Sequence, residues 1–488
     1  MLQNTQEGLY RLGKNGKPLK AIATHTKLTN GGKTYTIDLR HDAKWSNGDP
    51  VTAQNFVYSW RRTLTPKTAA QMQDYLYPVV NAKEIFAGKK APSTLGITAH
   101  GPYKLTIQLT KPVSYWKTLL AWPVFYPENP KIVQKYGNRY GTSSSRVVSD
   151  GPYQLTKWNG TSKTWTLAKN PHYWNKANVH LTAINYQVNE STATSYNLFM
   201  SKRADETLLS GQQVKNNLNN PNFVKRLPTG TQRLDMNQKK VPALKHLVIR
   251  QALSAAINRD QLVKNVLQDG SVASTGLVPV GMGKNPKTGE DFSHEAIVKS
   301  ATSYDLTRAK RLLAQGYHEL HTKHLDLTLS VGNTDATKQT AEFIQSSLEK
   351  LPGVKIAVRA IPYVQLMTQQ EQGNFELTLS GAQSVLADPN EYLGNYVGGT
   401  TDDNENITGF NNARYNRLMT QADNVDGNNP TLRWQKLIAA EKTLMTQQAV
   451  IPLFQQAKSQ LLRTTVKGII YNPAGIPFDF THAYMAQD

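Results

Sequence analysis

The sequence predicts an α/β protein with more than one lobe, and three observations carry this prediction. The chain has 488 residues, and at roughly 150 residues per domain this length favours two to four lobes. Residues 304–360 alternate between helical and strand patterns, which is typical of a parallel sheet with crossover helices. Hydrophobic residues make up 39% of the chain, which is compatible with folded cores, and no run is apolar enough to span a bilayer.

Residues 35–60 read YTIDLRHDAKWSNGDPVTAQNFVYSW and predict a strand, a turn and a helix in that order. The first residues alternate between apolar and polar, as in a half-buried strand. The Asn-Gly and Asp-Pro pairs at 47–50 favour a tight turn. Thr52 can cap a helix over residues 52–62. Taken alone, this unit is a packing module.

The spacing of apolar residues divides the rest of the chain into further helices and strands. Helices are expected at residues 68–87, 115–122, 192–200, 248–267, 304–314, 336–348 and 430–448. Strands are expected at residues 105–109, 179–188, 231–237, 325–331, 354–360, 375–380 and 450–454. Two α/β blocks therefore flank the middle of the chain, and an insertion interrupts the first block.

The chain is strongly basic, with 56 Lys and Arg against 35 Asp and Glu and a net charge of +21. Such a surface can bind nucleic acid, favour anionic cell-surface polymers or lipid head groups, or simply keep the protein solvated. The basic residues are spread along the whole chain, and no nucleic-acid-binding motif occurs. The sequence therefore predicts no nucleic-acid partner.

Catalytic and metal-binding motifs are missing from the sequence. There is no cysteine, which excludes disulfides, a thiol nucleophile and Cys-ligated zinc. His318, His321 and His324 do not share one helical face and do not form the HExxH pattern, so surface histidines are favoured over a metal site. No Gly-x-Ser-x-Gly motif occurs. The sequence predicts a protein that is not an enzyme and that has no cofactor or metal.

Several longer motifs carry a family resemblance. The run from W-S-N-G-D-P-V-T-A to F-V-Y-S-W in residues 45–60, the segment 85–109, and the SDGPYQL and KNPHYW wording of residues 149–174 resemble the bacterial extracellular solute-binding proteins of family 5. The similarity is to the oligopeptide-binding (OppA-type) ABC transporter component, with Asn55 standing where the family usually has Asp. The resemblance implies a periplasmic-binding-protein-like α/β fold, with two α/β lobes, a hinge and a smaller inserted domain.

The resemblance also implies a domain division. Residues 1–27 with 151–240 and 465–488 are expected to form lobe I. Residues 28–150 are expected to form the inserted domain II, and residues 241–464 are expected to form lobe III. A ligand is expected to be enclosed between lobes I and III.

The same resemblance implies the ligand-binding residues, most of them near the segment NFELTLSGAQSVLADPNEYL at residues 374–393. The expected ligand-lining positions are Tyr77, Asn237, Tyr363, Gly381, Ala382, Gln383 and Val385. The family's Asp that pairs with the amino terminus of a peptide falls on Val385, and a family Trp falls on Ala382. Either Asp388 or another carboxylate takes over this pairing, or the ligand is held through apolar and backbone contacts.

The function that the resemblance implies is extracytoplasmic capture of oligopeptides and their delivery to the transmembrane subunits of an ABC permease. The alternative is a peptide-signal receptor, or a basic cell-surface adhesin with a degenerate pocket. A monomer at the outer face of the cytoplasmic membrane is expected, in a family that is anchored by lipid. Residues 1–20 lack the apolar core of a signal peptide and a lipid-anchoring Cys, so the chain is expected to be N-terminally truncated.

Overall fold

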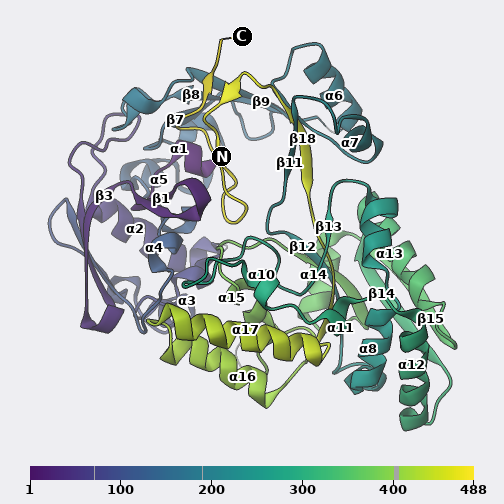
Figure 1. Ribbon diagram of the computed structural model, residues 1–488. Coiled ribbons are helices and arrows are strands. Elements are labelled where there is room, and N and C mark those ends of the chain that lie inside the picture. Colours follow the sequence, from purple (N-terminus) through teal and green to yellow (C-terminus); the bar gives the residue numbers. More distant parts are fainter. Residues whose placement is uncertain (71, 190, 400–405, 488) are drawn as a thin grey trace. The chain divides into compact units, whose positions relative to one another are not determined.

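The chain folds into two compact units, and both mix helices with sheets (Figure 1). The computed structural model describes residues 1–70, 72–189, 191–399 and 406–487. The first unit comprises residues 1–205 and 463–488, and the second comprises residues 206–462. The mixture of helices and sheets within each unit confirms the predicted α/β class.

The first unit contains short helices and several small antiparallel sheets. Its helices are α1 (Leu2–Thr5), α2 (Ala53–Leu64), α3 (Ala82–Phe86), α4 (Trp116–Leu119), α5 (Pro130–Tyr136) and α6 (Thr192–Met200). Its strands are β1 (Tyr10–Leu12), β2 (Pro18–Lys20), β3 (Ala23–Thr29), β4 (Thr34–Leu39), β5 (Ile97–Ala99), β6 (Lys104–Gln108), β7 (Tyr153–Thr156), β8 (Thr164–Lys169), β9 (Ala183–Gln187), β19 (Val466–Lys467), β20 (Ile470–Tyr471), β21 (Phe478–Asp479) and β22 (Tyr484–Met485). The larger sheets have the strand orders β3-β4-β6-β5 and β7-β8-β9.

Helix α2 begins as its sequence predicts, with a reciprocal capping box between Thr52 and Asn55. The Asn55 Oδ1 atom accepts hydrogen bonds from the Thr52 backbone N–H at 2.9 Å and from the Trp45 indole N–H at 3.2 Å. Trp60 is fully buried, and its indole donates to the Phe125 carbonyl at 2.9 Å. Asn55 therefore provides the cap that starts the helix and also holds the buried Trp45.

A buried ionic network joins the beginning and the end of the first unit. The Arg11 guanidinium contacts the Asp479 carboxylate at 2.7 Å and the Glu7 carboxylate at 3.0 Å. The Trp174 indole donates to the other Glu7 oxygen at 3.1 Å. Since the two carboxylates are almost fully buried, Arg11 supplies the charge that makes their burial possible.

The second unit is built around a six-stranded sheet. Its helices are α7 (Gln212–Asn216), α8 (Leu247–Ala255), α9 (Arg259–Gln261), α10 (Phe292–Glu295), α11 (Lys299–Thr302), α12 (Leu306–Leu320), α13 (Asp335–Leu348), α14 (Tyr363–Glu371), α15 (Asn390–Leu393), α16 (Ala413–Thr420) and α17 (Pro430–Thr446). Its strands are β10 (Glu206–Leu208), β11 (Phe223–Arg226), β12 (Thr231–Met236), β13 (Val272–Ala273), β14 (Leu325–Gly332), β15 (Val354–Ile361), β16 (Leu377–Ala382), β17 (Val450–Gln455) and β18 (Lys458–Leu462). The large sheet has the order β13-β17-β12-β16-β14-β15.

The predicted β-α-β arrangement in the second unit is confirmed. Strands β14 and β15 pair in parallel, and helix α13 connects them. Strand β16 also lies parallel to β14, whereas β12 pairs antiparallel with both β16 and β17. Helices α8 and α12 pack together beside this sheet (Figure 1). Leu329, Leu377 and Ile451 contribute one fully buried side chain each from three strands of the core.

Two expected helices are wrong in their extent. The predicted helix at 248–267 is interrupted after α8, because the Asn258 side chain caps a new start at α9, and residues 262–267 continue in a π-helical turn. The predicted helix at 68–87 is also wrong. Met72 and Asn81 adopt positive φ angles of 61° and 67°, which a continuous right-handed helix does not allow.

The boundary of the second unit differs from the boundary expected for lobe III. Residues 206–240 lie in the second unit, whereas the sequence assigned residues 151–240 to lobe I. The reason is the strand pairing: β10 and β11 both pair with β18, and β12 pairs with β16 and β17 in the large sheet. The finer division into three lobes stays a prediction.

A buried carboxyl group lies on helix α17, which contributes Leu437, Ala440 and Leu444 to a second hydrophobic cluster of this unit. Glu441 of α17 is 1% exposed, and its Oε1 atom accepts the Leu277 backbone N–H at 2.7 Å and the Val278 backbone N–H at 3.4 Å. Its Oε2 atom is buried without a partner among the described residues. Burial raises the pKa of Glu441 to about 7, so ionisation of this group opposes folding.

We expect the stability of the protein to depend on this carboxyl group between about pH 4.5 and pH 7. The folded state keeps the proton over this range while the unfolded chain releases it, so the free energy of unfolding falls as the pH rises. The E441Q variant mimics the protonated group. The difference in unfolding free energy between wild type and E441Q should change by about 3 kcal/mol between pH 4.5 and pH 8. Urea denaturation at several pH values measures it, and a constant difference contradicts the assignment.

Candidate functional site

The end of strand β16 and the loop after it hold four of the predicted ligand-binding residues. Gly381 and Ala382 are the last two residues of the strand, and Gln383 follows with an exposed side chain. A Cβ atom on Gly381 would lie 2.5 Å from the Gln232 side chain on the neighbouring strand. Glycine therefore lets the two strands and this glutamine approach closely.

Val385 lies below the surface of this loop. Its side chain is 7% exposed, and its backbone N–H donates to the Glu391 carboxylate at 2.9 Å. The Tyr392 hydroxyl donates to the Thr229 carbonyl and also to the Ala382 carbonyl at 3.1 Å. Glu391 and Tyr392 of the short helix α15 therefore hold the backbone of this loop through hydrogen bonds.

A buried polar cluster, formed by Arg233, Asp235 and Tyr396, lies beside this loop. The Arg233 Nε atom is 3.1 Å from Asp235 Oδ2, and the Tyr396 hydroxyl donates to Asp235 Oδ1 at 2.6 Å. Burial disfavours the guanidinium charge, but Asp235 and the nearby tyrosines raise the pKa of Arg233. The Arg233 Nη1 atom is buried without a hydrogen-bond partner among the described residues, so its two N–H donors are unused.

The sequence interpretation missed this cluster, although strand β12 contained a signal for it. In a strand, alternate side chains point to the same face, and Thr231, Arg233 and Asp235 alternate with the apolar Leu234 and Met236. That pattern places a polar row on a strand that is central in the sheet. The pairing of Arg233 with Tyr396 joins positions that are distant in the sequence, and no local pattern indicates it.

The carboxylates near Val385 already have partners. Asp388 forms a two-pronged ion pair with Arg433 of α17, at 2.7 and 2.9 Å. Asp235 is held by Arg233 and Tyr396, and Glu391 by the Val385 backbone. The Asp388 carboxylate is therefore already paired with Arg433 in this structure.

Two further predicted residues lie elsewhere in the second unit. Asn237 is 2% exposed, and its Nδ2 group donates to the Gly373 and Phe375 carbonyls at 3.0 Å each. Its Oδ1 atom accepts two backbone N–H groups of the following turn, so the side chain serves the backbone. Tyr363 begins α14 and is 66% exposed, next to Val364 at 77%. Their exposure leaves an aromatic and an aliphatic side chain free to contact a ligand.

Tyr77 belongs to the first unit. Its ring packs against Phe86 with a centroid distance of 6.1 Å, and the Lys83 ammonium lies 5.4 Å from the ring centroid. The side chain is half-buried. The other six predicted ligand-binding residues are all in the second unit.

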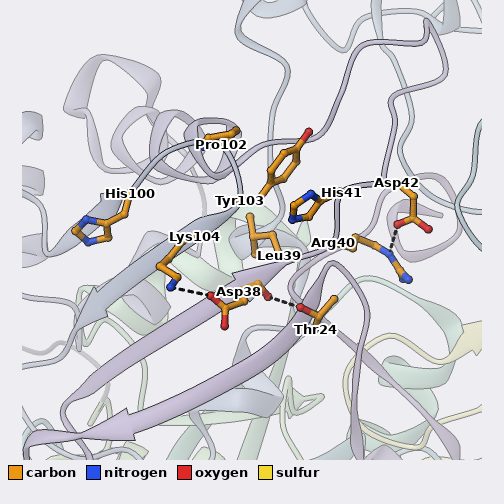
Figure 2. Close-up of a pocket in the computed structure, with 10 residues that line it drawn as sticks. All are labelled: Thr24, Asp38, Leu39, Arg40, His41, Asp42, His100, Pro102, Tyr103 and Lys104. Carbon is orange, nitrogen blue, oxygen red and sulfur yellow. Dashed lines mark hydrogen bonds and ion pairs between the residues drawn. The ribbon is translucent and has the colours of Figure 1, made fainter.

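The first unit has a pocket of about 720 Å³ that contains none of the predicted residues (Figure 2). The rings of His41 and Tyr103 stack on one side, with centroids 4.2 Å apart. Lys104 pairs with Asp38 at 3.3 Å, and Arg40, which directly follows β4, pairs with Asp42 at 2.8 Å. Because its charges compensate one another, the pocket offers no net charge to a ligand.

The described residues contain no group of His, Cys, Asp and Glu side chains that could hold a metal ion. His318, His321 and His324 are exposed at and after the end of α12. In the described part of the chain, no helix has both the length and the apolar character that crossing a membrane requires.

Comparison with known proteins identifies the family to which this chain belongs. Residues 17–404 match the family described as bacterial extracellular solute-binding proteins, family 5 Middle. The chain therefore belongs to the bacterial extracellular solute-binding proteins of family 5, as its motifs predicted.

The relatives are similar over nearly their whole length. The dipeptide-binding protein of Lactococcus lactis is 34% identical over 99% of this chain and 89% of its own. The structure of Listeria monocytogenes OppA bound to peptide is 33% identical, with a TM-score of 0.83 over 100% of this chain and 94% of that chain. The structure of the pheromone receptor PrgZ has the same TM-score and coverage at 34% identity. These similarities confirm the predicted periplasmic-binding-protein-like fold class.

Proposed function

We propose that the protein binds oligopeptides outside the cytoplasm and delivers them to an ABC permease. The observation that supports this proposal most strongly is the similarity over the whole chain to solved peptide-binding structures. Binding and release, without chemical conversion of the peptide, is the proposed activity. A monomer in the cell envelope, acting with the transmembrane subunits of a permease, completes the proposal. Enclosure of the peptide between lobes I and III stays a prediction.

Peptide contacts are proposed for the end of β16, the following residues and α14. The backbone of Gly381, Ala382 and Gln383 lies where an extended peptide could bond through its main chain, which leaves its side chains free to vary. Tyr363 offers an exposed aromatic wall. Val385 and Asn237 are proposed to support the site, because both side chains are buried.

The binding proposal is tested by incubating the purified chain with a mixed library of tri- to octapeptides and identifying retained peptides by mass spectrometry. A retained set of related peptides is expected. The Tyr363→Ala variant should bind the best retained peptide about fivefold to tenfold more weakly, because an aromatic contact contributes about 1 kcal/mol or more. Tyr304→Ala is the matched control, since Tyr304 is also exposed in the second unit. Equal losses in both variants contradict the role of Tyr363.

We further propose that the peptide amino group is not the main point of recognition. The family's amine-binding Asp falls on the buried Val385, and the nearby Asp388 is occupied by Arg433. An N-acetylated peptide should therefore bind within about threefold of the free peptide, whereas loss of a charge-assisted hydrogen bond costs about 1.5–3 kcal/mol. Isothermal titration of the matched pair measures the ratio. A loss greater than about tenfold on acetylation contradicts this proposal.

A further inference from the structure

The positive charge of the chain is unevenly divided between the two units. Residues 1–205 and 463–488 contain 29 Lys and Arg against 12 Asp and Glu, a net charge of +17. Residues 206–462 contain 27 Lys and Arg against 23 Asp and Glu, a net charge of +4. The two values add to the +21 of the whole chain. The first unit thus carries most of the excess charge, although it is the shorter of the two.

The excess charge of the first unit lies on its surface. Of its 29 basic residues, 21 are exposed. Among its described acidic residues, Glu7, Asp150 and Asp479 are buried and so are not presented at the surface to a partner. The Arg11 side chain, which is 11% exposed, pairs with Glu7 and Asp479 in the ionic network. The outer surface is therefore more positive than the formal net charge of the unit.

We propose that the first unit binds a linear, phosphate-bearing polyanion through its exposed lysines. Multiple lysines that neutralise phosphates release the counterions condensed on a linear polyanion, and this release drives binding without a shaped pocket. The exposed lysines occur on strands, helices and loops alike, for example Lys27 on β3 and Lys117 on α4. A flexible polymer can follow charges distributed in this way.

A lipid surface is the less favoured partner for these charges. Membrane-surface binding by a helix needs a basic polar face and an exposed apolar face. The longest described helix of the first unit, α2, buries Phe56, Val57 and Trp60 in the core. The next longest, α6, contains no Lys or Arg. Neither of these two helices has that combination.

This inference is separate from the proposed peptide binding. Six of the seven predicted ligand-binding residues lie in the second unit, and the seventh is the half-buried Tyr77. Substitution of exposed lysines at other positions of the first unit should leave the affinity for peptide unchanged. Polyanion binding would hold the protein at an anionic matrix while its peptide site remains in use.

The test uses the full chain and long-chain inorganic polyphosphate as the probe. One variant replaces five exposed lysines of the first unit with Gln, namely Lys27, Lys44, Lys67, Lys89 and Lys117. The matched control replaces five exposed lysines of the second unit with Gln, namely Lys215, Lys299, Lys310, Lys350 and Lys442. A third variant carries Arg at the five first-unit positions, which keeps the charge. Thermal melting and peptide affinity establish that each variant is folded.

The wild type should bind polyphosphate with an affinity that falls steeply as the salt concentration rises. The first-unit Gln variant should bind at least about tenfold more weakly, with a shallower dependence on salt. The second-unit Gln variant and the Arg variant should stay within about threefold of the wild type. Equal losses in both Gln variants, or no binding by the wild type, overturn the proposal. Binding to phosphatidylglycerol vesicles without binding to polyphosphate also overturns it and assigns the charges to a lipid surface.

Discussion

The Arg11→Met variant should lose about 3–5 kcal/mol of unfolding free energy, because removal of one partner leaves buried charges uncompensated. Arg11 contacts Asp479 at 2.7 Å and Glu7 at 3.0 Å, and both carboxylates are almost fully buried. Methionine fills a similar volume but supplies neither charge nor donors. Asp479 lies near the C-terminus and Arg11 near the N-terminus. The substitution therefore also removes an ion pair that joins these two segments.

Tryptophan fluorescence during urea denaturation measures the unfolding free energy of the first unit. Seven of the eight tryptophans lie in the first unit, and Trp434 is in the second. Arg139→Met is the matched control, because Arg139 is exposed in the same unit and surface substitutions usually change stability by less than about 0.5 kcal/mol. A change of less than about 1 kcal/mol in the Arg11→Met variant contradicts the importance of the network.

The Arg259→Met variant should lose about 3 kcal/mol or more, because it leaves several buried carbonyl groups without a donor. Arg259 is 4% exposed. Its guanidinium donates to the carbonyls of Pro452 at 2.6 Å, Thr302 at 2.8 Å, and Ser254 and Ile257 at 3.2 and 3.3 Å. Burial lowers the pKa of Arg259. Its stabilising contribution therefore comes from these hydrogen bonds, which join β17 to the ends of α8 and α11.

Hydrogen exchange followed by mass spectrometry locates this effect. Amides of β17 and α11 should exchange faster in the Arg259→Met variant than in the wild type, because both segments lose the same donor. Arg311→Met serves as the control, since Arg311 is exposed on α12. Arg259→Lys should fall between wild type and Met, because an ammonium has three donors in place of five. Unchanged exchange in β17 contradicts the proposed link.

The sequence correctly predicted structural units that depend on residues close together in the chain. The capping box of α2 follows from Thr52 and the residues after it, and the β14-α13-β15 unit follows from alternation between two periodicities. The break after α8 was missed, because the apolar spacing continues through residues 248–267 and does not reveal the cap at Asn258. Hydrophobic period reports which face is buried and says little about where a helix restarts.

Features that depend on distant partners could not be predicted from the sequence. Arg259 meets the carbonyl of Pro452, which lies 193 residues away, and any residue can supply such a carbonyl. Arg233 and Tyr396 meet only after β12 has entered the large sheet. The uneven division of charge is already present in the sequence, because residues 1–205 alone contain 27 Lys and Arg against 10 Asp and Glu, and residues 463–488 contain two of each. Lys and Arg are nearly equal in number in the two units, 29 and 27, so the asymmetry comes from Asp and Glu, with 12 and 23.

Thermal melting of the purified chain, with and without a mixed library of tri- to octapeptides, tests the proposed peptide binding most directly. A ligand that binds only the folded state raises its stability by RT ln(1 + [L]/Kd), which is about 2.7 kcal/mol at a hundred times Kd. We predict a clear upward shift with the library and no shift with the same concentration of free amino acids. A cooperative melt that no peptide in the library shifts would contradict the proposed function.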